Sequence, residues 1–174
     1  PYRKGMQVYD LVFMGGGFFE GGNITPSAEF NIYVDPHAAH RVIHCGRPVT
    51  MISLDVTHQA LMQRDWLNQI KELNSPVGDA SFGMLSFYER FDQNKYGNSG
   101  GPLHDPMVIA YLLHPEIFKG KLANVEIEIY SELTMGMTVV DWWGVTERGK
   151  NVNVISKVDP DKYFDLIIEK LKLL

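Results

Sequence analysis

The sequence contains only one cysteine, Cys45, so no disulfide can form within the chain. No apolar run approaches the roughly 18 residues that a membrane-spanning helix needs, and no secretory signal is visible at the start. Sixteen Lys and Arg residues face 21 Asp and Glu residues, for a net charge of −5. This balance argues against a basic surface for nucleic acid. We therefore expect a cytoplasmic protein with neither nucleic acid nor membrane as a partner.

The composition is otherwise that of an ordinary globular protein. Apolar residues make up 45% of the 174 residues and charged residues 21%, which argues against disorder. The length suits one domain, and we expect residues 1–174 to form it. The chain begins with Pro1 rather than Met, which indicates a processed product or a piece of a longer protein.

Short apolar segments alternate with helical patterns along the chain. The predicted strands are Gln7–Phe13, Pro48–Leu54, Leu122–Tyr130, Thr138–Trp142 and Asn151–Val158. The predicted helices begin at Asp35-Pro36, at Asp55 or Thr57 (ending near Leu73), at Pro76 (ending near Phe91), at Asp105-Pro106 and at Asp159-Pro160. This order predicts an α/β fold with an open, largely parallel sheet and flanking helices. Ligands bind at the carboxyl ends of such strands, which directs attention to the loops after Phe13 and Leu54.

A polar cluster follows the first predicted strand and its long Gly-rich loop. It contains Asn23, Glu29 and Asn31, with the aromatic Phe30 among them. In extended backbone Glu29 and Asn31 would project to the same side, where a carboxylate and a carboxamide could bind neighbouring sugar hydroxyls. The alternative is a polar loop whose side chains satisfy backbone groups. The pattern alone leaves both interpretations open.

A histidine and an aspartate stand together at the start of another predicted helix, in Gly100-Gly101-Pro102-Leu103-His104-Asp105-Pro106. His104 could donate a proton to a leaving group, and Asp105 could bind a hard cation such as Ca²⁺. The alternative is that Asp105 is only a helix cap and His104 only a loop residue.

Three further histidines, His37, His40 and His44, share one face of the helix that begins at Asp35-Pro36. Two of them at i, i+4 could hold zinc, but the sequence has no HExxH motif and no cysteine partner. A solvated helix face is the favoured interpretation.

The segments MGGGFFEGGNITPSAEFNIYVDPHAAHRVI, MISLDVTHQAL, GGPLHDPMVIAYLL and LTMGMTVVDWWG together resemble the inosine-uridine nucleoside hydrolase family. AEFNIYVDP and the distant HDP carry most of the resemblance, which spans almost the whole chain. It implies a Ca²⁺-dependent N-ribohydrolase that cleaves the N-glycosidic bond of purine or pyrimidine nucleosides to free base and ribose. TMGMTVVD looks most like the pyrimidine-preferring bacterial branch.

The resemblance also implies roles for individual residues. Asp105 matches a calcium ligand, and His104 matches the histidine that assists departure of the base. The ribose hydroxyls are bound by residues that match Asn23, Glu29 and Asn31, and the apolar contacts around the sugar match Met14 and Phe30. Such enzymes are homo-oligomers, dimers or tetramers, and their substrate is a ribonucleoside.

One departure from the family is large. The aspartate-rich motif DxDxxxDD, which supplies most calcium ligands in the family, is absent from this sequence. The resemblance therefore implies an incomplete fold, its C-terminal part, which would be inactive alone and would expose apolar surface at the strand Gln7–Phe13. The remaining alternative is a non-catalytic domain that binds ribose, a nucleoside or another protein.

Overall fold

The computed structural model describes residues 10–96 and 100–174. The described chain forms two compact units, and each is described here by itself. Unit 1 comprises Pro1–Val56 and Lys119–Lys157, and unit 2 comprises Thr57–Phe118 and Val158–Leu174. The expectation of a single domain over residues 1–174 stays a prediction. Within the described ranges, no helix has both the length and the apolar character needed to cross a membrane.

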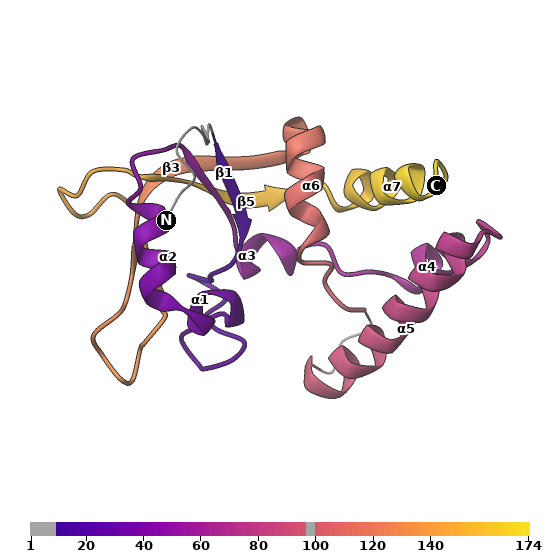
Figure 1. The fold of residues 1–174 in the computed structure, drawn as a ribbon, viewed down its shortest axis with the longest axis horizontal. Coiled ribbons are helices and arrows are strands. Elements are labelled where there is room, and N and C mark those ends of the chain that lie inside the picture. Colours follow the sequence, from indigo (N-terminus) through magenta and orange to yellow (C-terminus); the bar gives the residue numbers. More distant parts are fainter. Residues whose placement is uncertain (1–9, 97–99) are drawn as a thin grey trace, which may run out of the picture. The chain divides into compact units, whose positions relative to one another are not determined.

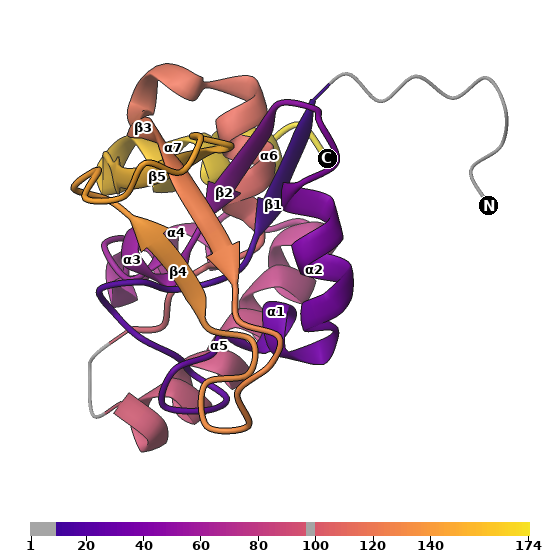
Figure 2. The same cartoon turned by 90° about the vertical axis from the view of Figure 1, so that its left-hand side faces the viewer.

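Unit 1 is built on a five-stranded sheet with the order β1-β2-β5-β3-β4. β1 pairs with β2 and β2 with β5 in parallel, whereas β3 and β4 are antiparallel (Figure 2). The strands are β1 (Leu11–Met14), β2 (Val49–Ile52), β3 (Phe118–Ile127), β4 (Thr138–Asp141) and β5 (Val152–Val158). The predicted open, largely parallel α/β sheet is thus confirmed. Residues 7–9 of the first predicted strand lie outside the described residues.

The core of unit 1 forms where the sheet buries its apolar side chains. On β3, Val125 and Ile127 are buried while Glu126 between them is only half-buried, because side chains alternate across a strand. Ile43, from the helix α2 (Pro36–Ile43), packs into the same cluster. The buried members are Ile32, Ile43, Val49, Met51, Ala123, Val125, Ile127, Val152 and Val154.

The helices of unit 1 include one that was predicted and one that was not. The helix α2 (Pro36–Ile43) begins as expected, with the Asp35 carboxylate accepting a hydrogen bond from the Ala38 amide at 2.9 Å. Glu29 is extended as assumed, but Phe30 and Asn31 belong to the short helix α1 (Phe30–Val34), so the extended backbone assumed for them is wrong. The reason is local, since the Glu29 side chain caps α1 at its N-terminus. The helix α3 (Leu54–Thr57) follows β2.

Unit 2 is helical. Helices α4 and α5 lie side by side (Figure 1), and α7 packs against α4 and α6. The Trp66 and Phe164 rings stack with centroids 3.9 Å apart, and Leu67, Met107 and Tyr163 are fully buried. The elements are α4 (Arg64–Lys71), α5 (Pro76–Tyr96), α6 (Pro106–Leu113), the 3-10 helix η1 (Pro115–Ile117) and α7 (Pro160–Leu171).

The continuous helix predicted from Asp55 or Thr57 to about Leu73 is wrong. The structure has α3 and α4 there, with residues 58–63 non-helical between them. Backbone pairing explains the break: the Met62 amide donates to the Gly101 carbonyl at 3.0 Å, and Leu61 bridges to Pro102. Hydrogen bonds to a distant segment therefore replace those of the helix at this point.

Candidate functional site

The Gly-rich loop after β1 is held by a turn that requires glycine. Gly16 has a φ of +79°, and a Cβ there would lie 2.6 Å from the Thr138 hydroxyl oxygen. A Cβ on Gly17 would lie 2.1 Å from the Gly21 carbonyl oxygen. Both positions exclude larger residues, so the chain leaves β1 along one fixed path.

Asp55 holds the next part of this loop. Its carboxylate accepts hydrogen bonds from the amides of Phe18 at 2.9 Å, Phe19 at 2.8 Å and Glu20 at 3.1 Å. The Ser53 hydroxyl also donates to it, at 3.1 Å. The sequence indicated Asp55 as a possible helix cap, but it lies inside α3. Its position directly after a buried strand was the signal that could have identified it.

Glu29 is buried, with 3% of its surface exposed, and its carboxylate is fully engaged with backbone. It accepts hydrogen bonds from the amides of Gly16 at 2.9 Å, Asn31 at 2.9 Å and Ile32 at 3.3 Å. Hydrogen bonds from amides to a carboxylate are stronger than those to a neutral acceptor. Glu29 therefore joins the Gly-rich loop to α1 and leaves a buried negative charge at the carboxyl end of β1.

Hydrogen bonds also connect Asn23 to Phe30 and Asn31 to Met14. Asn23 accepts a hydrogen bond from the Phe30 amide at 2.8 Å. Asn31 is exposed, and its Nδ2 donates to the carbonyl oxygen and the sulfur of Met14, both at 3.3 Å. The Phe30 ring is half exposed, at 52%. Residues Met14, Asn23, Glu29, Phe30 and Asn31 thus lie together in unit 1.

His104 lies in unit 2 with two partners from the segment that follows β2. Its Nδ1 is 2.7 Å from the Thr57 hydroxyl oxygen, and its ring centroid is 5.7 Å from that of His58. Burial, together with the neighbouring His58, lowers the pKa of His104 to about 4. The imidazole is therefore neutral near pH 7, and it donates from Nε2 when the Thr57 hydroxyl donates to Nδ1.

Asp105 precedes α6 but does not cap it. Asp35 and Asp159 begin their helices in the same Asp-Pro arrangement, and both accept a hydrogen bond from the helix amides. Asp105 accepts none, because its backbone is already helical, with φ −68° and ψ −37°, where capping needs an extended residue. The Asp105 carboxylate is exposed. The interpretation of Asp105 as only a helix cap is thus wrong, and its oxygens are available to a ligand.

Tyr163 of α7 holds the backbone ahead of His104. It is completely buried, and its hydroxyl donates to the Leu103 carbonyl at 2.9 Å. Burial raises the pKa of Tyr163, and the negative charge of Asp105 adds to this rise, so the phenol stays a donor. This link fixes the start of the segment that carries His104 and Asp105.

Calcium is the metal that the resemblance implies, and it takes six to eight oxygen ligands. In the described ranges, Asp105 belongs to no group of three or more metal-ligating side chains. The described residues therefore do not build a calcium site by themselves. Asp105 offers one carboxylate to such a site.

Comparison with known proteins gives a consistent result. The sequence pattern that defines the inosine-uridine preferring nucleoside hydrolases matches residues 5–165. An uncharacterised protein of Schizosaccharomyces pombe is 47% identical over 161 residues, which cover 92% of this chain and 52% of that protein. The pyrimidine-specific ribonucleoside hydrolase RihA of Photobacterium profundum is 43% identical over 166 residues, which cover 95% of this chain and 53% of RihA.

Solved structures agree with the sequences. The purine-preferring ribonucleoside hydrolase from Gardnerella vaginalis superimposes with a TM-score of 0.84 and 30% identity, over 95% of this chain and 54% of that one. The chain thus spans about half the length of the proteins it matches.

Proposed function

Because this chain belongs to the inosine-uridine preferring nucleoside hydrolase family, we propose that it carries the ribose-binding and leaving-group residues of a ribonucleoside hydrolase. The reaction is hydrolysis of the N-glycosidic bond, which releases a base and ribose. The observation that carries the proposal is Asp105, an exposed carboxylate at a helix start that accepts no capping hydrogen bond. A purely structural aspartate in this position would cap α6, as Asp35 caps α2.

The residues around β1 suit the sugar. The exposed Asn31 carboxamide can donate to and accept from ribose hydroxyls, while Met14 and Phe30 offer apolar contact. Glu29 acts chiefly by position, because three backbone amides already bind its carboxylate. Its fixed negative charge favours the positive charge that develops on the sugar when the glycosidic bond breaks.

His104 suits the departing base. A histidine with a pKa of about 4 is neutral near pH 7, so it holds no extra proton to transfer. We assign it a hydrogen bond from Nε2 to the base, oriented by Thr57 at Nδ1. Base preference within purine and pyrimidine nucleosides stays open, since RihA is named pyrimidine-specific and the Gardnerella hydrolase purine-preferring.

Calcium dependence is part of the proposal, with Asp105 as one ligand. The other ligands must come from carboxylates beyond these 174 residues, because the sequence lacks the DxDxxxDD motif and Ca²⁺ needs several oxygens. We therefore expect the 174-residue chain alone to show no hydrolysis of inosine or uridine above background.

Fragment complementation tests the proposal. The chain is mixed with the separately expressed N-terminal half of the Schizosaccharomyces pombe relative and with Ca²⁺, and ribose released from inosine and uridine is measured. Hydrolysis should appear with the wild-type chain, disappear with Asp105→Ala and survive in the matched control Asp35→Asn. His104→Ala should slow the nucleoside with the poorer leaving group more than the other.

Two outcomes would contradict the proposal. Equal loss of rate for both nucleosides in His104→Ala would remove His104 from the leaving-group role. A non-catalytic ribose-binding domain would instead bind ribose without Ca²⁺, and Asp105→Ala would leave this binding unchanged. The mixture would then show no hydrolysis. Isothermal calorimetry with ribose, with and without Ca²⁺, separates these cases.

A further inference from the structure

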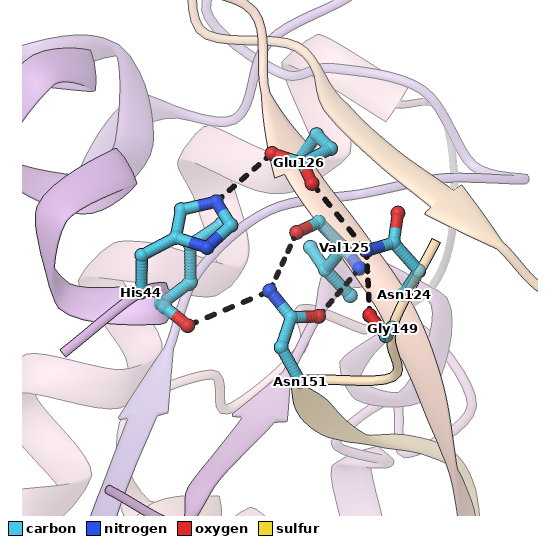
Figure 3. Close-up of polar contacts among 7 residues, drawn as sticks. His44, Asn124, Val125, Glu126, Gly149 and Asn151 are labelled. Atoms are coloured by element: carbon cyan, nitrogen blue, oxygen red, sulfur yellow. Dashed lines mark hydrogen bonds and ion pairs between the residues drawn. The ribbon is translucent and has the colours of Figure 1, made fainter. Parts of the chain in front are cut away.

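Helix α2 and strand β3 bring three metal-ligating side chains together outside the residues assigned above. His40 lies on α2, His44 directly follows this helix one turn later, and Glu126 extends from β3. One ligand atom from each residue lies within 4.8 Å of the others. The two imidazole rings have centroids 4.6 Å apart, and His44 Nε2 is 2.9 Å from a Glu126 carboxylate oxygen. Figure 3 shows the His44 ring directed at Glu126.

His40 adds a second, independent observation. Its Nδ1 is buried, and no described residue offers it a hydrogen bond. Buried polar atoms in folded proteins are nearly always satisfied, so each exception needs an explanation. An imidazole nitrogen without a proton has a lone pair that can bind a cation, and one of the two His40 nitrogens lies within 4.8 Å of the ligand atoms of His44 and Glu126.

The surrounding hydrogen bonds fix the two elements in this arrangement. Asn151 donates to the Val125 carbonyl of β3 at 2.9 Å, accepts from the Val125 amide at 2.8 Å, and reaches the Ile43 carbonyl of α2 at 3.5 Å. Asn124 lies beside the second Glu126 oxygen at 3.4 Å and donates to Gly149 at 2.9 Å (Figure 3). Side chains that orient metal ligands in this way are a regular part of metal sites.

We propose that His40, His44 and Glu126 bind one zinc ion. Two imidazole nitrogens and one carboxylate are a ligand set that Zn²⁺ takes, with bonds of about 2.0–2.2 Å and water in the fourth position. Tetrahedral ligands at that bond length lie about 3.3–3.6 Å apart, and the three ligand atoms here lie within 4.8 Å of one another. Calcium is a poor match because it prefers oxygen ligands in larger number. The site thus differs in metal from the one that Asp105 would join.

Positive side chains near the site lower the affinity that we expect for zinc. Arg47 and Lys150 line a hollow of 340 Å³ together with His44, and their positive charges oppose a divalent cation. Both histidines must also be deprotonated to bind metal. The sequence showed only the two histidines of this site, because Glu126 lies 82 residues after His44 and no sequence motif joins them.

Zinc binding to the metal-stripped 174-residue chain tests the proposal. Zn²⁺ is titrated against a competing chromophoric chelator, and one equivalent should bind and raise the melting temperature. His40→Ala and Glu126→Gln should each weaken binding by more than about 100-fold, because each removes one of three ligands. Asn124→Ala should weaken it by about 10-fold through loss of carboxylate orientation. His40→Ala leaves no unpaired partner, so the variant should fold.

Three matched controls keep the interpretation specific. His37→Ala removes an exposed histidine from the same helix, Cys45→Ser removes the exposed thiol next to His44, and His114→Ala removes an exposed His–Glu pair with a 2.8 Å contact. All three should retain wild-type affinity. Binding that survives His40→Ala, or that Cys45→Ser abolishes, overturns the proposal, as does absence of binding to the folded wild type. None of these results depends on hydrolase activity.

Discussion

His104 shows how burial decides the chemistry that a single side chain can perform. Its pKa near 4 in the folded chain, against an ordinary value of 6.5, means that the unfolded chain takes up this proton first as the pH falls. The stabilisation from a neutral His104 is complete above about pH 6.5 and is lost as the pH falls toward 4. The same shift makes the residue a hydrogen-bond donor rather than an acid at neutral pH.

The first prediction is therefore a pH dependence of stability that belongs to His104. Between pH 7 and pH 5 the wild type should lose about 1–2 kcal/mol more unfolding free energy than His104→Gln. Urea unfolding at both pH values measures this difference, and the His104 ring resonances in NMR give the pKa directly. Titration of His104 near 6.5 would show that the ring is solvated and the argument wrong.

The second prediction compares two aspartates with the same sequence context. Asp35→Ala should destabilise the chain by about 1 kcal/mol, because it removes a cap from α2. Asp105→Ala should change stability by less than about 0.5 kcal/mol, since Asp105 caps nothing. Thermal melting of both variants checks this. A loss of stability in Asp105→Ala equal to that of Asp35→Ala would show that Asp105 is a cap after all.

Elements were predictable from sequence where local signals are strong. Asp-Pro starts located α2, α6 and α7, and apolar runs located the strands, although β3 begins four residues before the predicted strand. The failures came where a capping side chain or pairing with a distant segment decides the backbone. α1 exists because Glu29 caps it and binds Gly16, and residues 58–63 leave the helix to pair near Gly101.

The candidate site was also predictable only in part. The residue types in GNITPSAEFN and HDP were visible in the sequence, and the structure brings the first group together around β1. The sequence could not show which carboxylate oxygens already accept hydrogen bonds from the backbone. The Glu29 carboxylate accepts hydrogen bonds from three backbone amides. The Asp105 carboxylate accepts no capping hydrogen bond from α6. Asp55 orders the loop, and its position directly after a buried strand was its one signal in the sequence.

The third prediction concerns the loop between β1 and α1 as an element. Asp55→Ala removes the acceptor of the Phe18, Phe19 and Glu20 amides, so these amides should exchange hydrogen faster and the loop should be cut more readily by protease. Hydrogen-exchange mass spectrometry measures the change. Asp65→Ala, at an exposed position on α4, is the control and should leave the loop protected. Unchanged protection in Asp55→Ala would show that the glycine turn alone orders the loop.

On the scale of the whole molecule, apolar side chains of β1 and α6 remain partly exposed outside the core. β1 is at one end of the strand order, and all four of its residues are only half-buried. On α6, Ile109, Leu112 and Leu113 are each more than half exposed although they follow helical spacing, which groups them on one face. Contiguous exposed apolar side chains of this kind mark surfaces that other protein covers. Relatives about twice as long have additional chain to cover them.

The fourth prediction follows from that surface: the 174-residue chain should self-associate through α6 and bind a hydrophobic dye. A double variant, Ile109→Lys with Leu112→Lys, should lower both the concentration-dependent mass in light scattering and the dye fluorescence, because two charges interrupt the apolar face of the helix. Both side chains are exposed, at 58% and 59%, so the fold should tolerate the change. Leu133→Lys, at a residue 86% exposed outside the helices, is the matched control and should associate like the wild type. A monomeric wild-type chain at high concentration, or association that the double variant leaves intact, would mean that α6 is not the surface through which copies meet.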